Sequence, residues 1–210
     1  MTAPLFTKME EILSKQLYKL DTEDNPVYQT LLHHAITALG SIAQGFPILS
    51  ANEKPRSGEK VFLRALEVSL AALRTLPTST AVKDATRFLF QRLLSCLGPS
   101  LLPFLPTVLT LMVVNCQPKD VVDFLPLITQ LLFRFQDAIF PFLDQLMSTL
   151  LDVVFNFLKQ VPSKAKVELN GVTVNSYEAQ QLLELERAYV TLMISIVNSG
   201  QAGVFTSEGL

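Results

Sequence analysis

Apolar residues recur along this chain at the three- and four-residue spacing of amphipathic helices, interrupted by proline, glycine and acidic turns. This spacing predicts eight helices, at residues 4–20, 26–45, 57–76, 79–97, 99–115, 118–135, 138–160 and 176–198. No alternating strand pattern competes with them, although residues 164–171 could form a small hairpin or an irregular loop. The predicted fold class is therefore all-α.

Local signals place several helix starts. Pro26 after Asn25 fits the first helical position behind an N-cap. Ser57 is a candidate cap for the third helix, and Thr78 or Ser79 for the fourth. One residue is instead expected to interrupt a helix: Pro126 lies well inside the predicted sixth helix. We expect that proline to kink the sixth helix or to mark a later start.

A short Phe-Leu motif with flanking proline or aspartate recurs at Phe104, Phe124 and Phe142, each time before an apolar helical run. The two steps together span about 38 residues, the length of one helix pair in a helical repeat array. The chain is therefore expected to be one segment, residues 1–210, of an α-solenoid. Its four antiparallel HEAT-type helix pairs cover about 4–45, 57–97, 99–135 and 138–198. Phenylalanines at helical spacing are expected in the core between repeats: Phe124, Phe133, Phe135, Phe140, Phe142, Phe155 and Phe157.

The composition is apolar, with 49% hydrophobic and 17% charged residues. Membrane insertion is not expected, because prolines, glycines and charges interrupt the long apolar runs. Helices inside a repeat array are covered by neighbours on both sides, and this also explains the apolar composition. Enzymatic chemistry also finds little support, since Cys96 and Cys116 lack metal or disulfide spacing and the two histidines are adjacent. The chain is interpreted as non-catalytic, with no cofactor of its own.

The net charge of −2 indicates no global attraction to nucleic acid, but its distribution is uneven. Residues 53–92 hold eight basic and four acidic side chains. Phosphate contact needs such a local basic surface. The candidate contacts fall on the third helix, the fourth helix, the connector before them and the loop after the seventh helix. They are Lys54, Arg56, Lys60, Arg64, Arg74, Lys83, Arg87, Lys164 and Lys166. The alternative is ordinary solvated surface charge, with Glu67 as an intrahelical partner for Arg64.

Six segments together resemble one family, the tRNA exportins (exportin-T). They are HAITALGSIAQGFP at 34–47, VFLRALEV at 61–68, FQRL at 90–93, CLGPSLLP at 96–103, DFLP at 123–126 and FPFLDQL at 140–146. Each is a packing motif and carries little weight alone. Their order and spacing from Leu31 to about Phe157 are more specific.

The resemblance implies a HEAT-repeat transport receptor of the importin-β superfamily. Such a receptor binds mature tRNA together with GTP-bound Ran in the nucleus and releases both in the cytoplasm. It implies shuttling through the nuclear pore, contact with pore components, and GTP only through the Ran partner. The chain would be an internal block of repeats from a longer receptor. Alternatives are a HEAT-repeat scaffold of another karyopherin or a protein-binding regulator, in either case without RNA binding.

Overall fold

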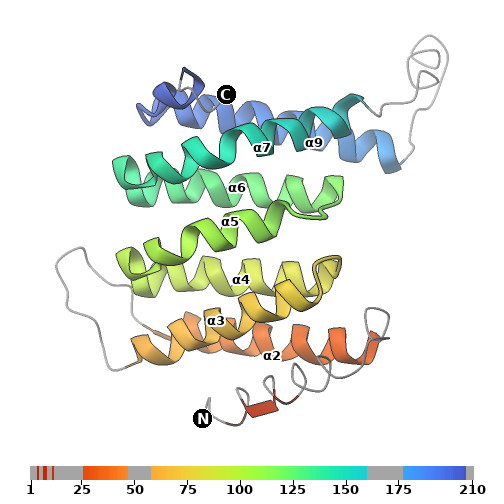
Figure 1. The fold of residues 1–210 in the computed structure, drawn as a ribbon, viewed down its shortest axis with the longest axis vertical. Coiled ribbons are helices and arrows are strands. Elements are labelled where there is room, and N and C mark those ends of the chain that lie inside the picture. Colours follow the sequence, from red (N-terminus) through yellow and green to blue (C-terminus); the bar gives the residue numbers. More distant parts are fainter. Residues whose placement is uncertain are drawn as a thin grey trace. The chain divides into compact units, whose positions relative to one another are not determined.

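The computed structural model describes residues 26–46, 58–159 and 177–206, with isolated positions at 4, 7–8 and 11. Every regular element in these ranges is a helix, and none of the described residues forms a strand (Figure 1). The all-α prediction and the α-solenoid class are confirmed, because neighbouring helices pack side by side within each part of the chain. The chain divides into two compact units, Met1–Asn115 and Cys116–Leu210. The prediction that residues 1–210 form one segment of four helix pairs stays a prediction.

The described part of the first unit has two layers of helices. Helix α2 packs along α4, while α3 contacts both of them and also α5. Helices α3 and α5 thus lie on one side of the unit, and α2 and α4 on the other (Figure 1). In chain order the elements are α2 (Pro26–Gln44), α3 (Glu59–Thr75), α4 (Thr80–Leu97), the 3₁₀ helix η1 (Gly98–Phe104) and α5 (Leu105–Val113).

Gly40 sets the close approach of α2 and α4. A Cβ atom at Gly40 would lie 2.7 Å from Cε1 of the Phe88 ring and 3.3 Å from the Leu89 Cα. Only a residue without a side chain leaves that space to the ring and to the α4 backbone. Gly40, one of two glycines in segment 34–47, is therefore a packing requirement between two helices.

Ser79 begins α4 and connects it to α2. Its hydroxyl accepts a hydrogen bond from the Val82 N–H at 3.4 Å and donates one to Oε1 of Gln29 at 2.8 Å. Of the two predicted caps, Ser79 is therefore the one the structure uses. Helix α3 begins at Glu59, and Gly58 at its N-cap position makes no side-chain cap hydrogen bond. The predicted cap of this helix, Ser57, lies outside the described residues.

The second unit is built on helix α6. Helix α9 packs along α6, and α7 contacts both. The side-chain amide of Gln201, 4% exposed, donates to Oδ1 of Asp137 at 2.9 Å and connects the chain after α9 to the turn after α6. The elements are α6 (Pro118–Phe135), the 3₁₀ helix η2 (Gln136–Ile139), α7 (Phe140–Lys159), α9 (Tyr177–Asn198) and the 3₁₀ helix η4 (Ala202–Phe205).

Helix α6 begins with a capping box and runs through its internal proline. The Gln117 N–H donates a hydrogen bond to Oδ2 of Asp120 at 2.9 Å, and the Gln117 side chain accepts one from the Asp120 backbone N–H. Pro126 lies inside the continuous helix, so the alternative of a later start is wrong. The proline is exposed and has no N–H to donate to the Val122 carbonyl four residues earlier.

Two predicted helices, at 99–115 and 138–160, begin later as α-helices than the apolar spacing indicated. Residues Gly98–Phe104 and Gln136–Ile139 form 3₁₀ turns, and α5 and α7 follow them. Gly98 and Gln136 are the first residues of these turns, and both have positive φ, 51° and 47°, which interrupts the α-helical backbone there. Pro103 inside η1 also lacks the N–H that an α-helix would need there.

The phenylalanine prediction holds for some positions and is wrong for two. Phe124 and Phe135 are buried, whereas Phe133 is 65% exposed and Phe155 is 42% exposed. Residues two apart on an α-helix lie about 200° apart around its axis. Phe133 therefore points outward where Phe135 points inward.

Two apolar stretches, Thr80–Val113 and Pro118–Lys159, are long and apolar enough to cross a membrane by length and composition. Each is divided by a 3₁₀ turn into two helices. Core leucines account for much of this hydropathy, among them Leu89, Leu93, Leu127 and Leu131, all 0% exposed.

Candidate nucleic-acid interface

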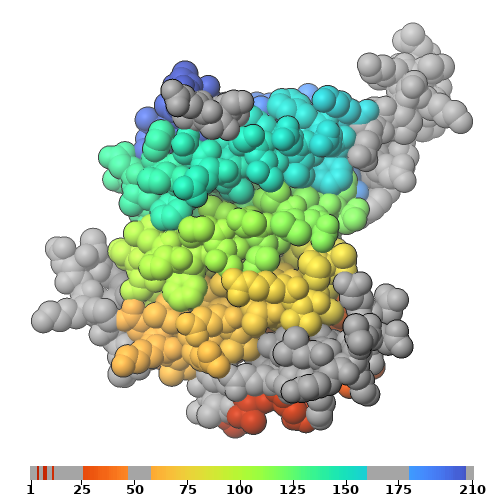
Figure 2. Space-filling view, viewed as in Figure 1, coloured from red at the N-terminus to blue at the C-terminus, as the bar shows by residue number. Residues whose placement is uncertain are grey.

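Three of the basic candidates form a stripe on the outward face of α3, called the α3 stripe below. Lys60, Arg64 and Arg74 are exposed. Phe62 and Leu73, on the opposite side of the helix, are buried. The helical period produces this separation, since residues three, four and seven apart share one face. Figure 2 shows the surface of α3, in orange, on the same face of the first unit as that of α5, in green.

The three cations of this stripe differ in their partners. Nη1 of Arg64 lies 3.2 Å from Oε2 of Glu67, and both side chains are about half exposed, at 56% and 49%. An exposed pair of this kind contributes little to stability, but it offsets the charge that Arg64 offers to a ligand. Within ranges 26–46, 58–159 and 177–206, neither Lys60 nor Arg74 has a carboxylate partner.

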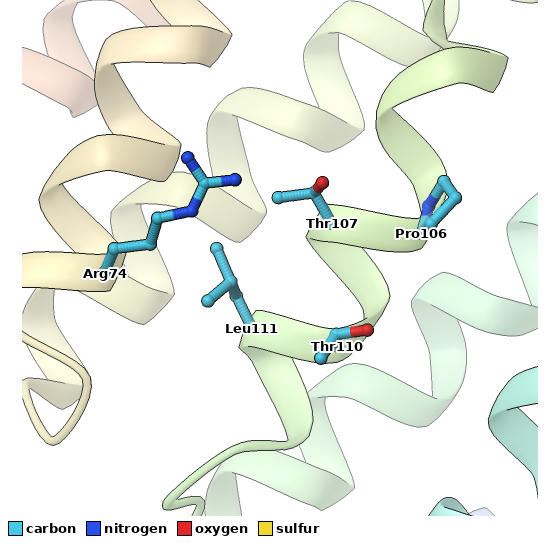
Figure 3. A pocket seen from close by; sticks show the side chains of 5 residues that line it. All are labelled: Arg74, Pro106, Thr107, Thr110 and Leu111. Carbon is cyan, nitrogen blue, oxygen red and sulfur yellow. The ribbon is translucent and has the colours of Figure 1, made fainter.

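A surface cavity of about 310 Å³ lies beside Arg74, between α3 and α5. Its lining is formed by Arg74, Pro106, Thr107, Thr110 and Leu111. Figure 3 shows the Arg74 guanidinium extended from α3 toward Thr107, with Leu111 below it. Arg74, Pro106 and Thr110 are exposed, so the cavity opens to solvent. Its lining combines a cation, two hydroxyls and apolar walls, with no acidic group.

Lys83 does not lie on an exposed face, which corrects the expectation for this residue. The side chain is 3% exposed, and its Nζ donates to the Asn115 carbonyl at 2.7 Å. Asn115 has a φ of 49°, in the left-handed region, at the turn that follows α5. The ammonium therefore connects α4 to that turn and is not accessible to a phosphate.

Arg87 is half-buried on α4 and bonds Oδ1 of Asp84 at 2.9 Å. Helix α4 lies in one layer of the unit with α2, whereas the α3 stripe lies in the other layer with α5 (Figure 1). Arg87 and the α3 stripe therefore belong to different layers.

Four of the candidates, Lys54, Arg56, Lys164 and Lys166, lie outside the described residues. Their role stays a prediction.

Three residues near these sites were missed by sequence reasoning. Thr107 and Thr110 line the cavity, but uncharged threonines in an apolar helix carry no sequence signal for a ligand. The third, Arg92, lies on α4 with its Cζ 5.0 Å from the centroid of the Phe88 ring. Its i, i+4 spacing from Phe88 could have indicated this contact.

Few of the described residues are suited to metal binding or to nucleophilic chemistry. Across the described ranges, no three His, Cys, Asp or Glu residues gather as metal ligands. Cys96 is 7% exposed, and burial raises the pKa of its thiol, which makes it a poor nucleophile.

Comparison with known proteins identifies relatives across nearly the whole chain. A family model described as Exportin-T matches residues 1–209. Exportin-T of Coprinopsis cinerea is 31% identical over 206 residues, which cover 95% of this chain and 18% of that protein. Exportin-T of Aspergillus terreus is 31% identical over 216 residues, which cover 98% and 19%. Exportin-T of Laccaria bicolor is 31% identical over 184 residues, which cover 84% and 16%. The chain spans about a fifth of the length of these curated relatives.

Proposed function

Because the chain belongs to the exportin-T family, we propose that it forms part of a nuclear export receptor for tRNA. The receptor binds mature tRNA together with GTP-bound Ran in the nucleus, passes through the nuclear pore by contacts with pore components, and releases both ligands in the cytoplasm. The observation that carries this proposal is the family match over residues 1–209.

The described surface supports a role in contact with a polyanion. The α3 stripe presents Lys60 and Arg74 without carboxylate partners, and helix α5 beside it has no charged residue. A folded RNA is recognised largely by its shape and its phosphates, which scattered basic side chains on a rigid surface can contact.

Cooperation between the two ligands follows from linkage. If tRNA and Ran-GTP favour the same curvature of a helical-repeat array, each raises the affinity of the array for the other by the same factor. GTP hydrolysis on Ran then lowers the affinity for tRNA without any chemistry in the receptor itself.

The proposal is tested with the full-length receptor, which is titrated with fluorescently labelled tRNA in the presence of Ran-GTP and, as a control, Ran-GDP. We expect binding that requires the GTP form and weakens steadily as salt increases. No retention of tRNA with Ran-GTP at low salt would contradict the proposal. Capture of Ran-GTP without tRNA would favour a karyopherin that carries protein.

A further inference from the structure

The cavity between α3 and α5 contains an arginine that is committed to no protein partner. Across the described ranges Arg74 has no hydrogen bond or ion pair, whereas Arg64 on the same face is paired with Glu67. The Arg74 side chain extends over the cavity toward Thr107 (Figure 3). A guanidinium in this position offers a planar set of N–H donors to whatever enters the cavity.

The two hydroxyls of the cavity are also available. Several helical threonines of this chain donate to the carbonyl four residues earlier, as Thr75 does to Ala71 and Thr191 does to Arg187. Thr107 and Thr110 have no such bond among the described residues. Their hydroxyls can therefore turn toward a ligand at no cost to an existing hydrogen bond.

These groups match a phosphate. A phosphodiester carries negative charge and accepts hydrogen bonds, and a guanidinium can donate two parallel N–H bonds to it. The lining has no carboxylate that would repel the anion. Pro106 and Leu111 supply apolar walls against which a sugar ring can pack.

We propose that Arg74, Thr107 and Thr110 form a binding site for one backbone phosphate of the RNA cargo. This inference rests on the proposed function, since it takes the ligand to be tRNA. It differs from a general basic surface, because the site joins two helices and uses hydroxyls as well as charge.

The test measures the affinity of the full-length receptor for labelled tRNA, with Ran-GTP present, over a series of salt concentrations. R74Q is expected to weaken binding about tenfold, since it removes a charge-assisted contact. It should also lower the slope of log affinity against log salt by about one unit. R74K should keep the slope but lose part of the affinity, because an ammonium cannot donate two parallel bonds. The double variant T107V/T110V should weaken binding and leave the slope unchanged.

Arg74 also lies in the last turn of α3, where a cation interacts favourably with the helix dipole. The thermal stability and the Ran-GTP affinity of each variant are therefore also measured. A loss of tRNA affinity without a change in either property reports phosphate binding and not the structural role. R64Q is the matched control, an exposed arginine on the same face whose charge Glu67 already offsets. It should change affinity less than R74Q.

The two proposals fail in different ways. If the wild-type receptor binds tRNA and R74Q binds it equally well, the phosphate site is wrong and the proposed function stands. If the wild type binds no tRNA with Ran-GTP, the proposed function is wrong and the phosphate site is overturned with it. Equal losses for R64Q and R74Q would also overturn the site in favour of a diffuse basic surface.

Discussion

Lys83 illustrates how one residue's role depends on its surroundings. A lysine with no hydrogen-bond partner would be costly at 3% exposure, yet its Nζ bonds the Asn115 carbonyl at 2.7 Å. We expect K83M to lower the free energy of unfolding by about 1–3 kcal/mol, because that carbonyl loses its charged donor. Urea denaturation followed by circular dichroism measures the change.

Lys60 provides the matched control for that substitution, since it is exposed on α3. K60M should alter the unfolding free energy by less than about 0.5 kcal/mol, as surface substitutions usually do. Equal effects of K60M and K83M would show that the Lys83 hydrogen bond is not a significant source of stability.

The Cys96 thiol should react slowly in the native protein. Burial raises its pKa, so less of the reactive thiolate is present at a given pH. At pH 8 we expect iodoacetamide to modify Cys96 more slowly than Cys116, which is half-buried, and both at similar rates in urea. Mass spectrometry of the labelled peptides compares the rates. Faster labelling of Cys96 in the native state would contradict this assignment.

The same shift has a consequence for stability. A raised pKa means that the folded state holds the thiol proton more tightly than the unfolded state. The contribution of Cys96 is therefore complete below the ordinary thiol pKa and is lost as pH increases through the raised value.

At the scale of elements, helix α4 depends on a cap that also bonds α2. Replacing Ser79 by alanine removes an acceptor for the Val82 N–H and a donor to Gln29. We expect S79A to reduce the unfolding free energy by about 1 kcal/mol, the typical effect of losing an N-cap. Thermal unfolding of the two alanine variants, S79A and T78A, measures it. Thr78 is exposed and is not the cap, so T78A should have little effect; a larger loss for T78A would reverse the assignment.

Element positions were largely predictable because their signals are local. The predicted range 118–135 coincides with α6, and α4 ends at Leu97 as expected. The beginnings of α5 and α7 were not predictable to the same degree. Their 3₁₀ turns depend on backbone angles at Gly98 and Gln136, and apolar spacing does not report those angles.

At the scale of the molecule, the accessible basic candidates on the described helices of the first unit belong to two layers: Lys60, Arg64 and Arg74 lie on α3, and Arg87 lies on α4. A double charge reversal on the α3 face, R64E/R74E, should weaken tRNA binding by the full-length receptor and flatten its salt dependence. The double variant R87Q/R92Q on the α4 face should change binding less. Fluorescence titration at several salt concentrations compares them. A larger loss for R87Q/R92Q would move the RNA contact to the α2–α4 face.

The sequence by itself determined the fold class, the approximate extent of the described helices and the family. These follow from the order of residues along the chain: a 3.6-residue apolar period, proline and glycine at helix ends, and packing motifs in a fixed order. It also placed Lys60, Arg64 and Arg74 on one face of a helix, since a helix fixes which of its own residues are neighbours.

Only the tertiary structure decided which of those charges are available to a ligand. It buried Lys83 against Asn115, left Arg87 half-buried on α4, and brought Arg74 beside Thr107 and Thr110. Each outcome depends on how separate helices pack against one another. Local periodicity does not encode those distances, because contacts between residues far apart in the chain are set by the shapes of whole packed faces.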